Sequence, residues 1–393
     1  MPDSISTRSS LPGRFATILR GVLAQPAGTD DNPFGTVLLR SLLDGEALSF
    51  AANSLSPPSA LGKLRLPPLR LAPLRGDESD EEIRALLPAP LRHYEVENHA
   101  KPEVICLPGQ AVFQVLNPDP APSHDPKLAG RVALVTGAAG AIGYGICRGL
   151  QERGCHVAIT DLPGDKFDRF VGEFAKQDAA HVLGVPMDVT DANSVASAFA
   201  SVSAAWGGVD IVVLNAGIAL ACPLIEIDLE VFRRLERVNV EGTLLVLAEA
   251  GRNFARQNLG GDIILVSTKN VFSPGAGFGA YSATKAAAHQ LARIASLEFA
   301  SMGVRVNMVA PDAVFSGGAH KSGLWAEVGP GRMKARGLDE KGLEDYYRNR
   351  NLLKAKVTAE HVANAVLFFA SRQTPTTGAC IPVDGGLPDA TPR

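Results

Sequence analysis

The sequence predicts an α/β protein: a doubly wound parallel sheet of seven strands, preceded by an irregular, proline-rich extension. Apolar runs of about five residues recur from Arg131 onward and alternate with helix-length segments, as buried parallel strands do. Most of the 27 prolines precede Lys127, so we divide the chain into an arm or small subdomain, 1–127, and a main domain, 128–393. With 393 residues, 46% of them hydrophobic, the chain can bury a large core.

The first residues, "SISTRSSLPGRFATILRGVLAQ", are basic and rich in serine, as in an organelle transit peptide. The favoured alternative is a poorly ordered N-terminus, because Pro12 and Gly13 should interrupt a helix. The later run "SPPSALGKLRLPPLRLAPLRG" predicts irregular structure. Next, "DESDEEIRALLPAPLRHY" opens with acids suited to a helix N-terminus, and "PEVICLPGQAVFQVL" predicts two short strands around Pro108 and Gly109.

The main domain should contain seven buried strands separated by helices. In chain order the strand segments are "RVALV", "HVAIT", "HVLGVPM", "VDIVVL", "GDIILVS", "VRVNMVA" and "CIPV". In open α/β sheets, ligands bind beyond the carboxyl ends of the strands. Functional residues are therefore expected just after each run.

A glycine-rich turn follows the first of these strands. Gly137, Gly140 and Gly143 lie between the strand and a helix, where the backbone can approach a pyrophosphate and the helix dipole meets its charge. Asp161 ends the second strand, at the spacing expected for a carboxylate that binds a ribose 2'-hydroxyl. Since Leu162 and Pro163 supply no base for a 2'-phosphate, we expect NAD rather than NADP. A helix N-cap is the structural alternative for Asp161.

This turn resembles the "TGxxxGxG" pattern of the short-chain dehydrogenase/reductase family, which has a Rossmann fold, although Ala141 replaces the middle glycine. The segments "MDV" (187–189), "LNAG" (214–217), "VNVEG" (238–242) and "YSATK" (281–285) resemble further family motifs in the family's order. The resemblance implies a cofactor site made of Gly137, Gly140, Ala141, Ile142, Gly143, Asp161, Leu162, Asp188, Val189, Asn215, Ala216, Gly217, Tyr281, Lys285, Pro311, Asp312 and Val314, and no metal.

The same resemblance implies the catalytic residues. Tyr281 would be the general acid or base, provided that its phenol is acidified, and the positive charge of Lys285 would favour the phenolate. Asn239 would support a water relay, unless it is only a helix-stabilising amide. The family's substrate-polarising hydroxyl falls on Thr268, with Ser267 as the alternative, because adjacent strand residues point to opposite faces.

A long insertion, residues 313–356, follows the sixth strand and should be a substrate loop. It holds nine Lys or Arg against five Asp or Glu, which suits a polyhydroxylated or phosphorylated substrate or, equally, a solvated face. The region resembles most the dehydrogenase half of bifunctional aldolase/short-chain dehydrogenases, of the rhamnulose-phosphate aldolase/alcohol dehydrogenase type. Residues 1–127 are too short for that aldolase and carry no His-x-His cluster, so we expect at most a remnant with a structural role.

Charge, hydrophobic patterning and cysteine content argue against some classes of function. The balance of 38 basic and 41 acidic residues argues against nucleic acid as a partner, and no apolar run is long enough for a membrane helix. Five cysteines without paired spacing suggest a reducing, cytoplasmic location. We expect an NAD-dependent oxidoreductase acting on a small hydroxylated molecule, or else a catalytically silent nucleotide-binding scaffold. The resemblance also implies a homo-oligomer, a dimer or tetramer formed through helices at 228–257 and 280–300.

Overall fold

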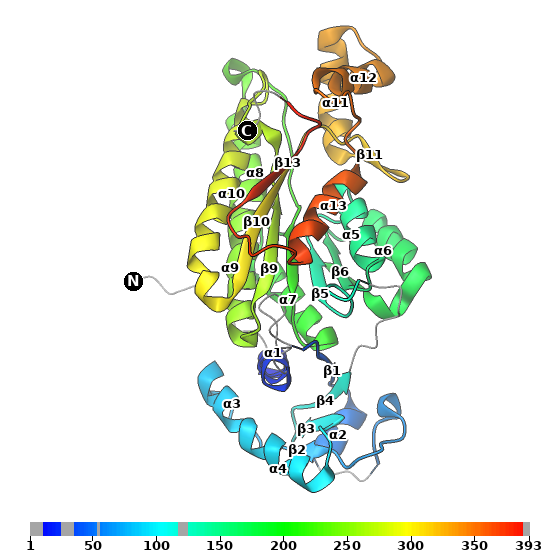
Figure 1. The fold of residues 1–393 in the computed structure, drawn as a ribbon, viewed down its shortest axis with the longest axis vertical. Coiled ribbons are helices and arrows are strands. Elements are labelled where there is room, and N and C mark those ends of the chain that lie inside the picture. Colours follow the sequence, from blue (N-terminus) through cyan, green and yellow to red (C-terminus); the bar gives the residue numbers. More distant parts are fainter. Residues whose placement is uncertain (1–10, 25–34, 53–55, 117–124, 388–393) are drawn as a thin grey trace.

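The main domain is built on a seven-stranded parallel sheet. The computed structural model describes residues 11–24, 35–52, 56–116 and 125–387 (Figure 1). The spatial strand order is β13-β10-β9-β8-β5-β6-β7, and every neighbouring pair is parallel, which confirms the predicted doubly wound sheet. Its strands are β5 (Val132–Val135), β6 (His156–Asp161), β7 (Val182–Pro186), β8 (Ile211–Leu214), β9 (Gly261–Val266), β10 (Val304–Pro311) and β13 (Cys380–Val383).

Helices cover both faces of this sheet, so its strands are apolar on both sides. In β5, Ala133 and Val135 pack on one face and Val132 and Leu134 on the other. The first face is covered by α5 (Ala141–Gln151), α6 (Asp165–Asp178) and α13 (Ala359–Ala370), and the second by α7 (Ala192–Trp206), α9 (Gly242–Gln257) and α10 (Gly279–Glu298). Shorter helices are η2 (Ala179–His181), η3 (Leu224–Glu226), α8 (Leu229–Glu236), η4 (Arg237–Glu241), η5 (Lys269–Val271) and η6 (Ala300–Met302).

The N-terminal segment forms a small subdomain that is more regular than its proline content predicted. Its four-stranded sheet has the order β1-β4-β3-β2 and lies between helices. The two strands predicted around Pro108 are present as β3 and β4, and their proline-free sequence permits a continuous ladder. The elements are α1 (Leu11–Leu23), β1 (Leu38–Leu42), α2 (Gly45–Ala52), η1 (Ser59–Leu61), β2 (Leu69–Arg70), α3 (Asp80–Leu86), α4 (Pro88–Asn98), β3 (Val104–Leu107) and β4 (Ala111–Leu116).

The prediction that Pro12 and Gly13 interrupt a helix is wrong. Helix α1 begins at Leu11, which places Pro12 in the first turn, where the N–H that proline lacks has no partner within the helix. The helix buries Phe15 and Ile18 and packs against α7 and α9 of the main domain. The predicted poorly ordered N-terminus therefore does not extend beyond residue 10, and residues 1–10 lie outside the described part of the chain.

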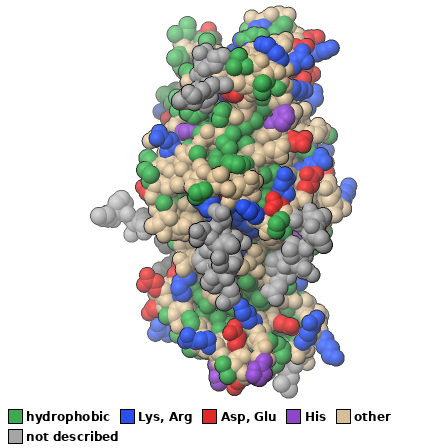
Figure 2. Space-filling model, viewed as in Figure 1, with side chains coloured by type: hydrophobic (Ala, Val, Ile, Leu, Met, Phe, Trp, Pro, Cys, Tyr) green, Lys and Arg blue, Asp and Glu red, His purple; other side chains and the backbone are tan. Residues whose placement is uncertain are grey.

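The subdomain and the substrate insertion lie at opposite ends of the main sheet (Figure 1). Arg20 of α1 reaches Asp210, which directly precedes β8, so the subdomain contacts the amino ends of the strands. On the face drawn in Figure 2, basic and acidic side chains are interspersed, in keeping with the even charge balance. Among the described residues, no helix is long and apolar enough to span a membrane.

The insertion at 313–356 is largely helical rather than a loop. It contains a short hairpin, β11 (Ser316–Gly317) and β12 (His320–Lys321), followed by α11 (Gly323–Arg336) and α12 (Glu340–Arg350). The rings of Phe315 and Trp325 stack at 4.6 Å, and Tyr347 contacts both edge-on. This aromatic contact joins α11 to α12. We call these two helices the lid.

Candidate active site

A cavity of about 670 Å³ lies at the carboxyl ends of the main strands, beneath the lid. This is the position expected for a ligand in a doubly wound sheet. Of the residues predicted to form the site, all except Asn239 line the cavity. They are Gly137, Gly140, Ala141, Ile142, Gly143, Asp161, Leu162, Asp188, Val189, Asn215, Ala216, Gly217, Ser267, Thr268, Tyr281, Lys285, Pro311, Asp312 and Val314.

The glycine-rich turn forms a cradle that only small residues can build. Gly137 has φ +58°, and a Cβ there would lie 2.6 Å from the Cα of Ala216. A Cβ at Gly143 would lie 2.3 Å from the carbonyl oxygen of Ala138. Gly140 caps α5 without a side-chain hydrogen bond, so the first N–H groups of that helix remain available to an anion. The cradle therefore fits the pyrophosphate of a dinucleotide.

Asn215 connects the end of β8 to this cradle. Its amide nitrogen donates to the carbonyl oxygens of Gly137 at 2.7 Å and Thr136 at 3.0 Å. The Thr136 hydroxyl in turn accepts hydrogen bonds from the backbone N–H groups of Asn215 and Ala216. The sequence analysis missed Thr136, although it is the first residue of the quoted glycine motif.

Asp161 lies at the end of β6 and faces the cavity. Its two carboxylate oxygens accept hydrogen bonds from the backbone N–H groups of Ala139 and Leu162, each at 2.8 Å. The carboxylate therefore also supports the glycine-rich turn. Lys166, in the first turn of α6, lines the same part of the cavity and was missed because only the two residues after Asp161 were searched for a base.

The segment "MDV" also contributes to the cavity, through Asp188 and Val189. The Asp188 carboxylate accepts hydrogen bonds from the backbone N–H and the hydroxyl of Thr190, both at 2.8 Å. Val189 is buried, and a Cβ at Gly242 would lie 2.8 Å from its side chain. These contacts hold the loop against α9.

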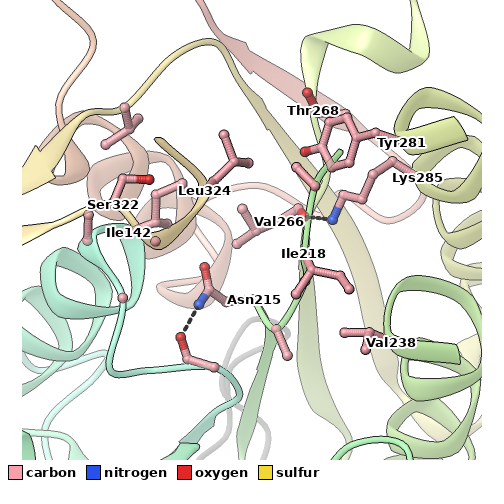
Figure 3. Close-up of a pocket in the computed structure, with 18 of the residues that line it drawn as sticks. Ile142, Asn215, Ile218, Val238, Val266, Thr268, Tyr281, Lys285, Ser322 and Leu324 are labelled. Atoms are coloured by element: carbon pink, nitrogen blue, oxygen red, sulfur yellow. Dashed lines mark hydrogen bonds between the residues drawn. The ribbon is translucent and has the colours of Figure 1, made fainter. Parts of the chain in front are cut away.

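Tyr281 and Thr268 face one another at the far wall of the cavity, and Figure 3 shows their hydroxyl oxygens side by side. Tyr281 is 9% exposed; burial raises the pKa of its phenol to about 12, against the opposing effect of a hydrogen bond with Thr268. Ser267 is different, because its hydroxyl lies 3.0 Å from Nδ1 of His289 in a buried contact with α10. Of the two adjacent hydroxyls, Thr268 is the one that meets Tyr281.

Lys285 lies one helical turn after Tyr281 and is 6% exposed. Its ammonium donates to the carbonyl oxygen of Val266 at 2.7 Å (Figure 3), and burial lowers its pKa to about 8. The expected acidification of Tyr281 is not what the structure shows: burial dominates the phenol, and Lys285 is not among the causes of its pKa shift. The physical reason is that burial penalises the charged phenolate.

Asn239 lies behind the cavity wall, in the π-helical turn η4. Its side-chain oxygen accepts from the backbone N–H of Ile218 at 2.9 Å, and its nitrogen donates to the Ile218 carbonyl at 2.9 Å and the Thr284 hydroxyl at 3.0 Å. The amide thus connects η4 to α10 and to the segment after β8. These contacts do not decide between the water relay and the structural role predicted for Asn239, which both stay predictions.

The segment after β10 connects the cavity to the lid. The Asp312 carboxylate forms an ion pair with Arg350 of α12, while Pro311 and Val314 are buried. Asp312 therefore both lines the cavity and holds α12 above it.

Comparison with known proteins agrees with this geometry. The family described as enoyl-(acyl carrier protein) reductase matches residues 137–388. The chain is 39% identical over 271 residues to the uncharacterized oxidoreductase YuxG of Bacillus subtilis; the match covers 68% of this chain but only 39% of that relative's length. It is 30% identical over 263 residues to D-threitol dehydrogenase of Mycolicibacterium smegmatis, covering 67% of this chain and 94% of that protein.

A solved structure of a dehydrogenase also resembles this chain. Sorbitol-6-phosphate 2-dehydrogenase SrlD of Erwinia amylovora superposes with a TM-score of 0.60 at 28% identity, covering 65% of this chain and 98% of that one. The family match over residues 137–388 contains six of the seven strands of the sheet, the glycine cradle and the tyrosine–lysine pair. The chain therefore belongs to the short-chain dehydrogenase/reductase family of oxidoreductases.

Proposed function

We propose that this protein is an NAD(H)-dependent oxidoreductase that transfers hydride between nicotinamide and a secondary alcohol or carbonyl of a small hydroxylated substrate. One observation carries the proposal: the hydroxyl groups of Tyr281 and Thr268 meet in the cavity whose other side is the glycine cradle. A proton-transfer group and a hydrogen-bond donor thus share one ligand site. This pairing is what catalysis at a carbonyl or alcohol requires.

In the proposed mechanism the protein moves the proton. As the phenolate, Tyr281 would take the proton of the substrate hydroxyl during oxidation, and as the neutral phenol it would return that proton during reduction. Thr268 would donate a hydrogen bond to the same substrate oxygen, and Lys285 would hold the nicotinamide ribose. The residues proposed to bind the rest of the cofactor are those of the cradle, Asp161 and the loop at Asp188 and Val189. When bound, the nicotinamide supplies the hydride chemistry.

The proposal is tested with a panel of polyols, hydroxy acids and deoxysugars, each mixed with the protein and NAD while absorbance of the reduced cofactor is followed. The relatives' names, D-threitol, L-2,3-butanediol and sorbitol dehydrogenases, support this choice of substrates. The alternative is a nucleotide-binding scaffold without turnover. Tight NAD binding with no turnover of any compound would support the scaffold.

We propose NAD rather than NADP because the Asp161 carboxylate would repel a 2'-phosphate. Two observations favour NADP: Lys166 also lines the cavity, and the similar L-sorbose reductase of Gluconobacter frateurii was solved with NADPH. Asp161→Asn should lower NAD affinity by roughly tenfold and raise NADP affinity, because it removes the charge while keeping an acceptor for the turn. Titration of the bound reduced cofactor by fluorescence measures both constants. Tighter wild-type binding of NADP than of NAD would contradict the assignment.

We also propose that the chain self-associates through α9 and α10. Support comes from apolar side chains that these helices leave exposed: Leu244 at 49%, Ile294 at 42% and Leu297 at 78%. Leu297→Asp should lower the molecular mass measured by sedimentation velocity, because a charge would be buried in the contact. Leu86→Asp, an exposed leucine of the N-terminal subdomain, is the matched control. A monomeric wild-type protein would rule the proposal out.

For the N-terminal subdomain we propose a structural role, as the remnant of an aldolase domain of the bifunctional type. Its contacts with α7 and α9, at the amino ends of the main strands, support a stabilising function. The long YuxG relative, of which this chain spans 39%, supports a larger ancestor.

A further inference from the structure

Three cationic side chains gather at the end of the cavity beyond Thr268. Lys269 directly follows Thr268 in η5, Arg332 comes from α11, and Arg350 comes from α12. They belong to segments far apart in the sequence. The fold brings them into the same cavity as Thr268 and Tyr281, where they could contact a substrate that is hydrogen-bonded to that pair.

Arg332 is held rigidly and keeps hydrogen-bonding capacity. Its guanidinium lies over the ring of Phe278 at 4.8 Å, and its terminal nitrogens reach the Ala276 carbonyl at 3.4 Å and the Tyr347 hydroxyl at 3.3 Å. The Nε atom is buried, and no group in the described part of the chain accepts its hydrogen. The Phe278 ring also contacts Tyr281, with centroids 6.2 Å apart. Phe278 therefore contacts both Arg332 and Tyr281.

Lys269 is half-buried in the same corner. Its ammonium donates to the Ser273 carbonyl at 3.0 Å, which uses one of its three hydrogens. Its pKa is lowered, first by burial and then by Arg350 and Arg332, whose effect is opposed by Asp312 and Asp384. A bound anion would relieve this unfavourable environment.

Three carboxylates lie near these three cations, those of Asp312, Asp384 and Glu327, and among the described residues only Asp312 forms an ion pair with one of the three cations. Arg350 is neutralised by Asp312 and stacks on the ring of Tyr347 at 4.2 Å. Glu327 also lines the cavity, on the exposed side of α11. Across the ranges that the structure describes, neither Lys269 nor Arg332 forms an ion pair. These two residues are left to attract an anion.

We propose that Lys269 and Arg332 bind an anionic group of the substrate, a phosphate or a carboxylate, so that the substrate is a hydroxylated molecule carrying such a group. This inference depends on the proposed oxidoreductase function and assigns its substrate class. A planar guanidinium with a free N–H and an ammonium point charge together match the oxygens of either anion. An uncharged polyol would leave both cations without a partner in a partly desolvated corner.

The test compares three related substrates in the NAD-dependent assay: sorbitol, sorbitol 6-phosphate and gluconate. We expect kcat/KM to be at least about tenfold higher for a charged substrate than for sorbitol. Comparing sorbitol 6-phosphate with gluconate shows whether the site prefers a phosphate or a carboxylate. The charged substrate's kcat/KM should also fall as ionic strength rises, while that of sorbitol should not. Equal or better turnover of sorbitol would overturn the inference and leave the proposed function intact.

Variants then assign the effect to the two side chains. Lys269→Gln and Arg332→Gln should each lower kcat/KM for the preferred anion by roughly 10- to 100-fold, mainly through KM, with sorbitol little affected. Arg332→Lys should recover part of the loss, since it restores the charge. Lys334→Gln is the control, because Lys334 is an exposed base on the same helix that does not line the cavity. An equal loss for sorbitol and the anion would indicate a structural role and contradict the assignment.

A binding measurement separates the two proposals if no compound in the panel is turned over. Calorimetric titration of the NAD complex with inorganic phosphate should show binding that is weakened in Lys269→Gln and Arg332→Gln and unchanged in Lys334→Gln. That result would retain the anion site although the proposed reaction had failed. No phosphate binding, or binding unaffected by the two variants, would reject the anion site.

Discussion

Replacing Tyr281 with phenylalanine should lower kcat by about a thousandfold while changing the NAD dissociation constant by less than about threefold. The substitution removes only the hydroxyl that faces Thr268, and the ring keeps its packing against Phe278. Steady-state kinetics and cofactor fluorescence measure the two quantities. Tyr346→Phe is a matched control, because Tyr346 is an exposed lid residue that does not line the cavity.

The pH dependence provides a second readout of Tyr281. Burial raises the pKa of its phenol to about 12, so the phenolate that accepts a proton becomes more abundant as pH rises. Alcohol oxidation should therefore accelerate with pH until the protein unfolds, whereas carbonyl reduction, which needs the neutral phenol, should not. The rise should be absent from Tyr281→Phe. Unchanged kcat in that variant, or an identical pH profile, would refute the assignment of Tyr281 as acid and base.

Arg20→Met should destabilise the whole chain by about 3 to 5 kcal/mol. Arg20 is 1% exposed, and its guanidinium donates to the Asp210 carboxylate at 2.8 Å, the Val37 carbonyl at 2.6 Å and the Gln257 side-chain oxygen at 3.2 Å. Burial alone would raise the pKa of Asp210, but Arg20 and Arg131 hold it below its usual value. Removing Arg20 would leave a buried carboxylate poorly compensated.

Urea unfolding measures this loss. Arg65→Met, an exposed arginine of the same subdomain, should change the free energy of unfolding by less than about 0.5 kcal/mol. Combining Arg20→Met with Asp210→Asn should cost less than the sum of the two single changes, since neither charge is then buried alone. A loss below about 1 kcal/mol for Arg20→Met would show that the subdomain is not held by this ion pair.

The N-terminal segment shows why part of the fold could not be predicted. Its prolines suggested irregular structure, yet those in the described residues fall in loops and at helix starts and leave β3 and β4 free of proline. Pro12 was judged by its residue type, whereas its effect depends on which turn of the helix contains it. Likewise, the insertion was predicted to be a loop. Its helix pair was missed because the aromatic contact that pairs α11 with α12 joins residues distant in sequence.

The candidate active site also combines features that the sequence predicted with features that only the structure shows. The buried strands could be predicted from sequence because each is a short run of apolar residues. The glycines of the turn could be predicted because they lie at fixed spacings where the backbone passes close to other backbone atoms. The orientation of Lys285 towards Val266, the contact of Ser267 with His289 and the convergence of Lys269 with Arg332 could not be predicted from sequence.

By itself, then, the sequence determined the seven-stranded sheet and the edge at which a ligand binds, because periodicity and motif order depend on neighbouring residues. Only the tertiary structure decided the ionisation of Tyr281, the partner of Arg20 and the cationic corner beneath the lid. Each of these depends on burial and on charges contributed by residues remote in the chain, and neither quantity is encoded in local spacing.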